Sequence, residues 1–592
     1  MPGRVITAIT VAAFGLTLAA CAPSNPVVSG RAPAASGIAL DARGARWVES
    51  TLARMTLEEK IGQLISCRYT GAFMPADSDA RAALKDLIVR SKIGGLVIFL
   101  GDAYETAHLN NDLQALSRIP LLIASDFERG VGTQITGTTL YPTLMAVGAS
   151  GSEDIAWQMG RATALEGRAL GVHQTYAPVV DVNINPDNPI INTRAIGEDP
   201  ELVARLAAAF VRGCQESGML ATGKHFPGHG DTDVDSHSRL PVIAASRDRL
   251  DRVELYPYRK LIAGGVASIM VAHLQVPALD PTPDLPSSLS APILTGLLRK
   301  EMGFRGLIVT DAMEMGGVTT LFSPEEAALR AILAGVDQVL LPLEPAKVVA
   351  SLVEAVKSGR LPSARVDESV RRVLEAKARV GLHLSRTVDI AALPAKLGSK
   401  DRLREAQTAF EKAATLVKND ASLLPLPAAG KKIAVLSLSS DAADYYAGRT
   451  FAESVRKRAP SASIFYADAT TGQAALDEAF RNAVKADVAV CALFSSLRAW
   501  KGSVGLDPRH VDLIRTLAAC GTPVVAVDFG SPYLLRGFPE TAAFLCLYRN
   551  TPQAQDVAAR AVFGEIDVTG RLPVSLPGLF PAGQGIDLKK IK

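Results

Sequence analysis

Short apolar runs alternate with longer helical patterns between about residues 47 and 382. The apolar runs cover residues 61–66, 95–99, 120–126, 174–180, 221–226, 267–273, 306–311 and 337–341. Helical patterns separate them, for example at 201–216, 292–302 and 324–334. Eight buried strands that alternate with helices are typical of a (β/α)8 barrel. The pattern therefore predicts an α/β chain that begins with a TIM-type barrel.

A second α/β pattern follows the barrel. A helix predicted over 368–380 and the stop at Gly381 end the first domain. Apolar runs at 433–438, 463–466, 488–493, 523–528 and 543–547 then alternate with helical patterns at 474–485, 509–520 and 554–563. This pattern predicts an open wound sheet of about five strands. We expect the barrel over 41–384, a connector over 385–430 and the second domain over 431–592.

The N-terminus resembles a bacterial lipoprotein signal. Arg4 precedes an apolar run over 5–20, which ends in Leu18-Ala19-Ala20-Cys21. The run is shorter than a membrane-spanning helix requires, and small residues before a cysteine are typical of a processing site. We predict a signal peptide over 1–20, lipidation of Cys21, a flexible tether over 21–40, and a lipid-anchored, extracytoplasmic protein that faces the periplasm. The alternative is a secretory peptide cut near Ala20 that leaves Cys21 unmodified.

Composition narrows the class of ligand. The formal net charge is +3 over 592 residues, which is too small to indicate binding to nucleic acid or to a charged membrane surface. The six cysteines include Cys21, and the remaining five have no metal-ligand spacing. We expect no disulfide framework, and a small-molecule or glycan substrate.

Polar residues lie at the carboxyl ends of the predicted barrel strands, where the active site of such a barrel is built. These residues are Asp126, Asp181, Lys224, His225, His273 and Asp311. The segment 224–237 also holds three of the eight histidines and three aspartates. A loop with so many ionisable groups contributes little apolar burial, so its composition indicates that it acts on a ligand.

Asp311 and the pair of His237 with Asp235 suggest a retaining glycoside hydrolase. Asp311 ends an apolar strand and is the candidate nucleophile, although an aspartate there could instead cap the next helix. His237 is the candidate proton donor, and Asp235 would fix its tautomer and raise its basicity. These two residues could also simply cap turns in a glycine-rich loop.

A metal loop is the alternative interpretation of Asp231, Asp233, Asp235 and His237. A calcium loop requires glycine at its sixth position and glutamate at its twelfth, where this chain has Ser236 and Val242. A zinc site would require His225, His229 and His237 to converge. We predict no metal and no cofactor.

The loop motif resembles the signature of bacterial family 3 glycoside hydrolases of the β-N-acetylglucosaminidase branch. The motif is Lys224-His-Phe-Pro-Gly, His229-Gly230 and Asp235-Ser-His237. Further similar segments lie at 55–64, 185–189, 192–200, 271–273, 416–420, 423–426 and 570–574. The resemblance implies an αβα sandwich as second domain, Asp311 as nucleophile, His237 as acid/base and Asp235 as its partner. It also implies that the sugar hydroxyls bind to Asp126, Arg194, Lys224 and His225.

One departure from the family pattern concerns Arg129. The branch typically has Asp-x-Glu-Gly-Gly-Arg after its third strand, whereas this chain has Asp126-Phe-Glu-Arg-Gly-Val131. A guanidinium displaced by two positions cannot make the same bidentate contact. Whether Arg129 contacts the substrate is therefore left open.

The expected function is a retaining exo-β-N-acetylglucosaminidase that acts on peptidoglycan fragments or chitooligosaccharides. A β-glucosidase or β-xylosidase of the same family, or a non-catalytic glycan-binding lipoprotein, are the alternatives. A neutral imidazole does not repel an anion, which favours acidic leaving groups and would also admit phosphate as the acceptor. The exact sugar and aglycone, the choice between hydrolysis and phosphorolysis, the role of the second domain and the oligomeric state stay open.

Overall fold

The computed structural model describes residues 40–427, 430–442, 447–495 and 505–591. The predicted signal peptide, Cys21 and nearly all of the predicted tether lie outside these residues. Among the residues that are described, no helix is both long enough and apolar enough to cross a membrane.

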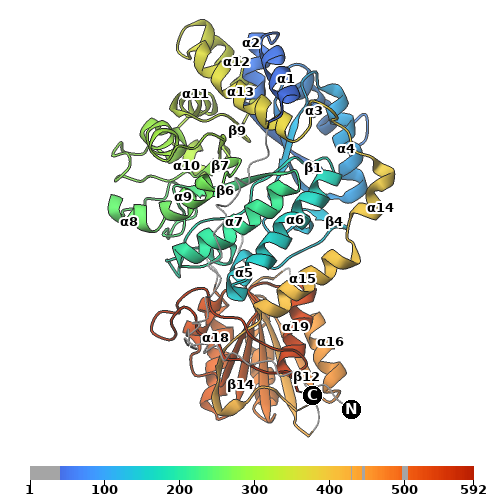
Figure 1. The fold of residues 1–592 in the computed structure, drawn as a ribbon. Helices are drawn as coiled ribbons and strands as arrows, with labels where there is room; N and C mark the ends of the chain where they lie inside the picture. Colours follow the sequence, from blue (N-terminus) through green and yellow to red (C-terminus); the bar gives the residue numbers. More distant parts are fainter. Residues whose placement is uncertain (1–39, 428–429, 443–446, 496–504, 592) are drawn as a thin grey trace, which may run out of the picture. The chain divides into compact units, whose positions relative to one another are not determined.

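Eight parallel strands form the barrel that the apolar runs predict, which confirms the fold class (Figure 1). They are β1 (Ile65–Gly71), β2 (Gly95–Asp102), β3 (Leu122–Ser125), β5 (Gln174–Thr175), β6 (Leu220–Phe226), β7 (Ser268–Val271), β8 (Leu307–Thr310) and β9 (Val339–Leu340). The order is β8-β7-β6-β5-β3-β2-β1-β9, and the short β4 (Ile135–Thr136) pairs with β2. A bridge between Val309 and Gln338 links β8 to β9. The carboxyl ends of all eight strands therefore lie on one side.

Helices alternate with these strands along the chain. They are α1 (Ala42–Leu52), α2 (Leu57–Gln63), α3 (Asp79–Val89), α4 (Ala103–Leu116), α5 (Leu144–Ser150), α6 (Glu153–Ala169), α7 (Pro200–Glu216), α8 (Arg247–Arg252), α9 (Leu255–Ala263), α10 (Gly316–Thr319), α11 (Pro324–Ala334), α12 (Pro345–Lys357) and α13 (Ser363–Arg379). The helix predicted over 292–302 is a π-helix at Pro292–Glu301. The helical patterns at 201–216, 292–302 and 324–334 thus match α7, the π-helix and α11 to within about one residue.

The first predicted strand, at 61–66, is wrong in its position. Residues Leu57–Gln63 form α2, and β1 begins only at Ile65. Thr56 accepts a hydrogen bond from the backbone of Glu59, and the Glu59 side chain accepts one from the backbone of Thr56. This reciprocal cap stabilises a helix start by satisfying two backbone donors. The local capping signal therefore outweighs the apolar run.

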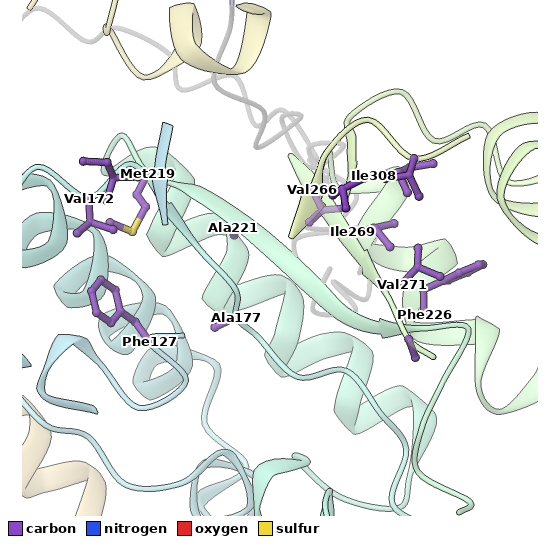
Figure 2. Packing of buried hydrophobic residues seen from close by; sticks show 14 of the residues in the cluster. Phe127, Val172, Ala177, Met219, Ala221, Phe226, Val266, Ile269, Val271 and Ile308 are labelled. Atoms are coloured by element: carbon purple, nitrogen blue, oxygen red, sulfur yellow. The ribbon is translucent and has the colours of Figure 1, made fainter. Parts of the chain in front are cut away.

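The barrel core holds the polar residues of the strand ends in place. Figure 2 shows part of this core, in which Phe127, Phe226 and Val271 are labelled. All three side chains are fully buried, and each lies next to, or two positions from, a polar residue of the strand ends. Burying a large apolar side chain contributes about 1.5–3 kcal/mol. These residues therefore anchor the short segments that carry Asp126, His225 and His273.

Among the residues that the structure describes, the second sheet has six strands, one more than the apolar runs predict. Its order is β10-β15-β14-β13-β11-β12, made of β10 (Thr415–Asn419), β11 (Ile433–Ser439), β12 (Ser463–Ala467), β13 (Val488–Phe494), β14 (Val524–Asp528) and β15 (Ala543–Cys546). The extra strand, β10, pairs antiparallel with β15 at the edge of the sheet. It lies within the predicted connector and is only five residues long. Only Leu416 and Val417 of this strand are apolar, which is too short a run for pattern analysis to detect.

Helices also pack around the second sheet and precede it. They are α14 (Leu393–Lys396), α15 (Lys400–Ala413), α16 (Arg449–Arg458), α17 (Gln473–Ala483), α18 (Pro508–Ala519) and α19 (Pro552–Val562). The first two lie in the segment predicted as a connector, together with β10. This segment is therefore largely regular structure.

Direct contacts join the second domain to the loops of the barrel. The carboxylate of Glu198 accepts hydrogen bonds from the backbone N–H and the hydroxyl of Ser575, at 2.7 and 2.5 Å. The side-chain amide of Asn183 donates to the hydroxyl of Tyr533 at 2.9 Å. Met145 of α5 is buried in the same apolar cluster as residues of the second sheet. These contacts hold the second domain beside the loops that follow β5.

Candidate active site

Four of the six polar residues at the strand ends, Asp126, Lys224, His225 and Asp311, line one cavity of about 570 Å³. This volume lies in the range of about 300–1,000 Å³ that is usual for small-molecule sites. Six of the residues predicted from the sequence line it, namely Asp126, Arg194, Lys224, His225, His237 and Asp311. Asp235 does not line the cavity but lies behind His237 as its buried partner. The chain thus brings the predicted site residues together from five separate segments.

Asp311 follows β8 directly and presents an ionised carboxylate to the cavity. One of its oxygens accepts the backbone N–H of Ala312 at 2.7 Å. Burial alone would raise its pKa, but the charges of His225 and His273, the Ala312 N–H and the charge of His237 together lower this pKa to about 2. Nearby positive charge and a hydrogen bond both favour the charged form of a carboxyl group. The carboxylate is therefore available as a nucleophile or as an electrostatic stabiliser at any ordinary pH.

His237 and Asp235 form a hydrogen-bonded pair. Nδ1 of His237 lies 2.7 Å from Oδ1 of Asp235, which also accepts the His237 backbone N–H at 2.9 Å. An ionised carboxylate can only accept, so the imidazole carries a proton on Nδ1. The Asp235 side chain is 5% exposed, whereas that of His237 is 26% exposed. Because Nδ1 is bonded to Asp235, proton transfer by this ring would run through its other nitrogen, Nε2.

Gly316 allows the histidine loop to pack against the segment that follows Asp311. The backbone N–H groups of Gly316 and Gly317 donate to the carbonyl oxygens of His237 and Ser236, at 2.9 and 3.1 Å. A Cβ atom at position 316 would lie only 2.5 Å from the carbonyl oxygen of Ser238. Glycine is required at such a close backbone approach. The two loops that carry Asp311 and His237 are therefore docked directly on one another.

A network of charged groups forms one wall of the cavity. Lys224 places its Nζ 2.7 Å from both Asp126 and Glu128. Arg194 binds Glu128 in a bidentate manner, through Nε at 3.0 Å and Nη2 at 2.7 Å. Burial opposes ionisation of Glu128, but the two cations hold its pKa well below the usual range. Burial would lower the pKa of Lys224, but Asp126 and Glu128 raise it. Lys224 and Arg194 therefore both stay charged.

Asp181 organises two histidines of the motif. It lies behind the cavity and is fully buried, with Oδ2 2.7 Å from Nδ1 of His225. Its other oxygen accepts the backbone N–H groups of His225 and His229, at 3.1 and 2.7 Å. Burial would raise the pKa of Asp181, yet the charge and hydrogen bond of His225 lower it. Asp181 therefore holds His225 in a defined orientation toward Arg194, whose Nη2 lies 3.4 Å from Nε2 of His225.

The structure also bears on the metal alternative. Both ring nitrogens of His229 are engaged, Nδ1 with Thr232 and Nε2 with Ser236, each at 2.9 Å. Burial lowers the pKa of His229 to about 4, so it is a neutral part of the loop scaffold near pH 7. Within the described ranges, no three His, Cys, Asp or Glu side chains are arranged to hold a metal ion. The zinc interpretation would require His229 to give up one of these two bonds.

Several residues of the site were not predicted in their observed roles. Arg68 lines the cavity and pairs with Glu314 at 2.8 Å. His273 fixes the nucleophile loop, because its Nε2 lies 3.0 Å from the carbonyl oxygen of Ala312. Arg549 reaches the cavity from the second domain. The position of His273 after a strand signals a site residue, whereas no local pattern marks Arg68 or Arg549.

The charge network should contribute to stability as well as to the site. Glu128→Gln removes the carboxylate between Lys224 and Arg194 and is expected to cost roughly 3 kcal/mol at pH 7, because it leaves two buried cations with less compensation. The pKa of Glu128 is lower in the folded state than the unfolded value of 4.5. The stabilisation that its carboxylate provides is therefore present above pH 4.5 and is lost as the pH falls through the folded-state pKa. The difference in Tm from wild type should therefore hold from pH 7 to pH 5 and shrink at lower pH in calorimetric scans.

Glu153→Gln is the matched control for this experiment. Glu153 pairs with Arg205 at 3.2 Å, and both side chains are about half exposed. Such a surface pair contributes less than about 1 kcal/mol. Equal effects of the two substitutions at pH 7 would contradict the role assigned to Glu128.

Known proteins share this sequence and fold. The chain is 34% identical over 415 residues to the beta-hexosaminidase A of Pseudoalteromonas piscicida, covering 63% of this chain and 69% of that protein. A solved family 3 beta-N-acetylglucosaminidase from Paenibacillus sp. is 31% identical with a TM-score of 0.79, over 88% of this chain and 99% of that one. A solved beta-glucoside phosphorylase, BglX, is 28% identical with a TM-score of 0.82, over 91% and 97% of the two chains.

Family models cover both domains. The glycosyl hydrolase family 3 N-terminal domain matches residues 56–376, which span the barrel strands. The glycosyl hydrolase family 3 C-terminal domain matches residues 414–581, which include β10 and the whole second sheet. This chain is a glycoside hydrolase and belongs to glycosyl hydrolase family 3.

Proposed function

We propose that the chain is a retaining exo-β-N-acetylglucosaminidase that removes terminal N-acetyl-β-hexosamine residues from peptidoglycan fragments or chitooligosaccharides. One observation carries the proposal. The ionised carboxylate of Asp311 and the Asp235-bound imidazole of His237 line the same cavity, on loops that are hydrogen-bonded to each other. A nucleophile and a proton donor at one sugar site are what retention requires.

The first step forms a glycosyl-enzyme. An oxygen of Asp311 bonds to the anomeric carbon while the bond from that carbon to the glycosidic oxygen breaks. His237 reacts as an imidazolium: it gives its Nε2 proton to the departing oxygen and keeps its Nδ1 proton in the hydrogen bond to Asp235. In the second step, His237 takes a proton from water as that water attacks the anomeric carbon, and Asp311 leaves as a carboxylate.

The charge network is the proposed binding site for the sugar hydroxyls. Lys224 uses two of its three N–H donors on Asp126 and Glu128, which leaves one donor for a hydroxyl. Asp126 is 26% exposed and can accept hydroxyl hydrogens through its second oxygen. His225 and Arg194 lie beside them in the same cavity. These four residues would orient the ring before the reaction.

Asp311→Asn tests whether the chain is an enzyme or only a binder. Turnover of 4-nitrophenyl N-acetyl-β-glucosaminide is expected to fall about 10⁴-fold or more, because no charged nucleophile remains. Binding of N-acetylglucosamine, followed by calorimetric titration, should survive. Asp233→Asn is the control, because Asp233 is an exposed carboxylate of the histidine loop. Normal turnover by Asp311→Asn would refute the assignment of Asp311 as the nucleophile.

The same assay separates the alternatives within the family. The wild-type enzyme should prefer the N-acetylglucosaminide to the glucoside and to the xyloside. A strong preference for the glucoside or xyloside would favour the β-glucosidase or β-xylosidase alternative. Binding without turnover of any aryl glycoside would favour the non-catalytic alternative.

The pKa of Asp311 predicts how the first step depends on pH. Its value of about 2 means that the nucleophile stays charged from pH 7 down to about pH 3. A 2-deoxy-2-fluoro glycosyl fluoride needs little help from a proton donor, so its reaction reports the nucleophile alone. Mass spectrometry should show labelling of Asp311 at a rate that is nearly constant between pH 7 and pH 4. A rate that fell with a midpoint above pH 4 would be inconsistent with this environment.

We also propose that the enzyme is anchored to the membrane by a lipid on Cys21 and faces the periplasm. The support is the sequence of Arg4, the apolar run over 5–20 and the Leu18-Ala19-Ala20-Cys21 ending. An alkyne fatty acid fed to cells should label the wild-type protein and leave Cys21→Ala unlabelled. Label in neither protein would support cleavage as an ordinary secretory peptide.

A further inference from the structure

Two arginines from different domains line the cavity together with Asp311. Arg129 lies in the loop after β3, and Arg549 follows β15 in the second domain. Burial lowers the pKa of Arg129 most, and the positive charge of Arg549 lowers it further, to about 9. Two like charges are thus brought close to each other at the wall of the active-site cavity. Repulsion between two like charges is unfavourable, and a negatively charged ligand would relieve it.

The guanidinium of Arg129 lacks a counterion in the described part of the chain. Its backbone N–H donates to the hydroxyl of Thr133 at 3.1 Å, and its carbonyl accepts from Tyr141 at 2.9 Å. No hydrogen bond or ion pair to the guanidinium itself occurs among the described residues. The adjacent Glu128 raises its pKa, but both oxygens of Glu128 already bind Arg194. A partly buried cation without a close partner is costly.

The other cations of the cavity differ from Arg129 in this respect. Arg68 pairs with Glu314 at 2.8 Å. Lys224 and Arg194 are each within 3.0 Å of Glu128. Among the described residues that line the cavity, the cation without a close counterion is therefore Arg129, and Arg549 lines the same cavity. An anion in the cavity would be attracted to this pair.

We propose that Arg129 and Arg549 form an oxyanion subsite within the cavity that holds the reacting sugar, which rests on the proposed function. The ligand is a carboxylate or a phosphate, because a planar guanidinium binds these groups through two parallel hydrogen bonds. The oxyanion can come from either of two sources. One is an acidic group on the leaving part of the glycan, and the other is free inorganic phosphate. The second domain then takes part in substrate selection through Arg549.

A matched pair of substrates tests the first source. The 4-carboxyphenyl and 4-carbamoylphenyl N-acetyl-β-glucosaminides have nearly the same size and differ by one negative charge. The ratio of their kcat/KM values should favour the carboxylate in the wild-type enzyme. This ratio should fall roughly tenfold or more in Arg129→Gln and in Arg549→Gln, since a hydrogen bond to a charged group is lost. A general folding defect would lower both values and leave the ratio unchanged.

Arg305→Gln is the matched control. Arg305 is an exposed arginine just before β8, at the opposite end of that strand from Asp311. Its substitution should leave the ratio at the wild-type value.

Inorganic phosphate tests the second source, with the neutral carbamoylphenyl substrate at constant ionic strength. If HPO₄²⁻ accepts the sugar, one phosphate oxygen bonds to the anomeric carbon as the bond to Asp311 breaks, and Asp311 leaves as a carboxylate. Phosphorus NMR would then detect a glycosyl phosphate in the wild-type reaction. Its share of the product should fall at least tenfold in both arginine variants and not in Arg305→Gln.

Each outcome decides the proposal. A charge preference that both arginine variants lose assigns the subsite to the leaving group, and a glycosyl phosphate that they lose assigns it to free phosphate. Wild-type ratios and products in both variants would overturn the subsite. If the wild-type enzyme cleaved neither glycoside, the proposed function would fail instead. Titration of phosphate into wild-type and Arg129→Gln protein would then decide the subsite alone, with loss of binding expected in the variant.

Discussion

The carboxylate of Glu128 is the constraint on which the site depends. It lies between Lys224 of β6 and Arg194 of the loop after β5, at distances of 2.7–3.0 Å. Three charges taken largely out of water are stable together only when their geometry is close and complete. Because the three residues come from three different parts of the barrel, their mutual attraction ties these parts together. Asp126 joins the same network and is its most exposed member.

Residues of the same type have different roles in this site because their surroundings differ. Asp181 and Asp235 are buried and each orients a histidine, whereas Asp311 lines the cavity itself. His229 is as prominent in the motif as His237, yet both of its nitrogens are bonded within the loop. Residue type and spacing alone do not distinguish these cases. Burial and hydrogen-bond partners do, because they decide which atoms remain for a ligand.

The sequence predicted the barrel and most of the polar residues that meet at its cavity, because both depend on local patterns. A buried parallel strand is a short apolar run, and the residue that follows it falls at the rim, as Asp126 and Asp311 do. The first strand was misplaced because the reciprocal cap of Thr56 and Glu59 extends a helix into the apolar run. The edge strand β10 was missed because its pairing with β15 joins residues more than 100 positions apart. Arg549 reaches the cavity by the same kind of distant packing, which no local pattern encodes.

The contact at Gly316 has a mechanical consequence. The backbone of the histidine loop and the backbone that follows Asp311 touch with no side chain between them. A displacement of one loop must therefore be transmitted to the other, since no flexible group is available to absorb it. Asp311 and His237 therefore lie on one rigid unit rather than on two loops that move independently. Backbone geometry, and not the conformation of a long side chain, sets the distance between them.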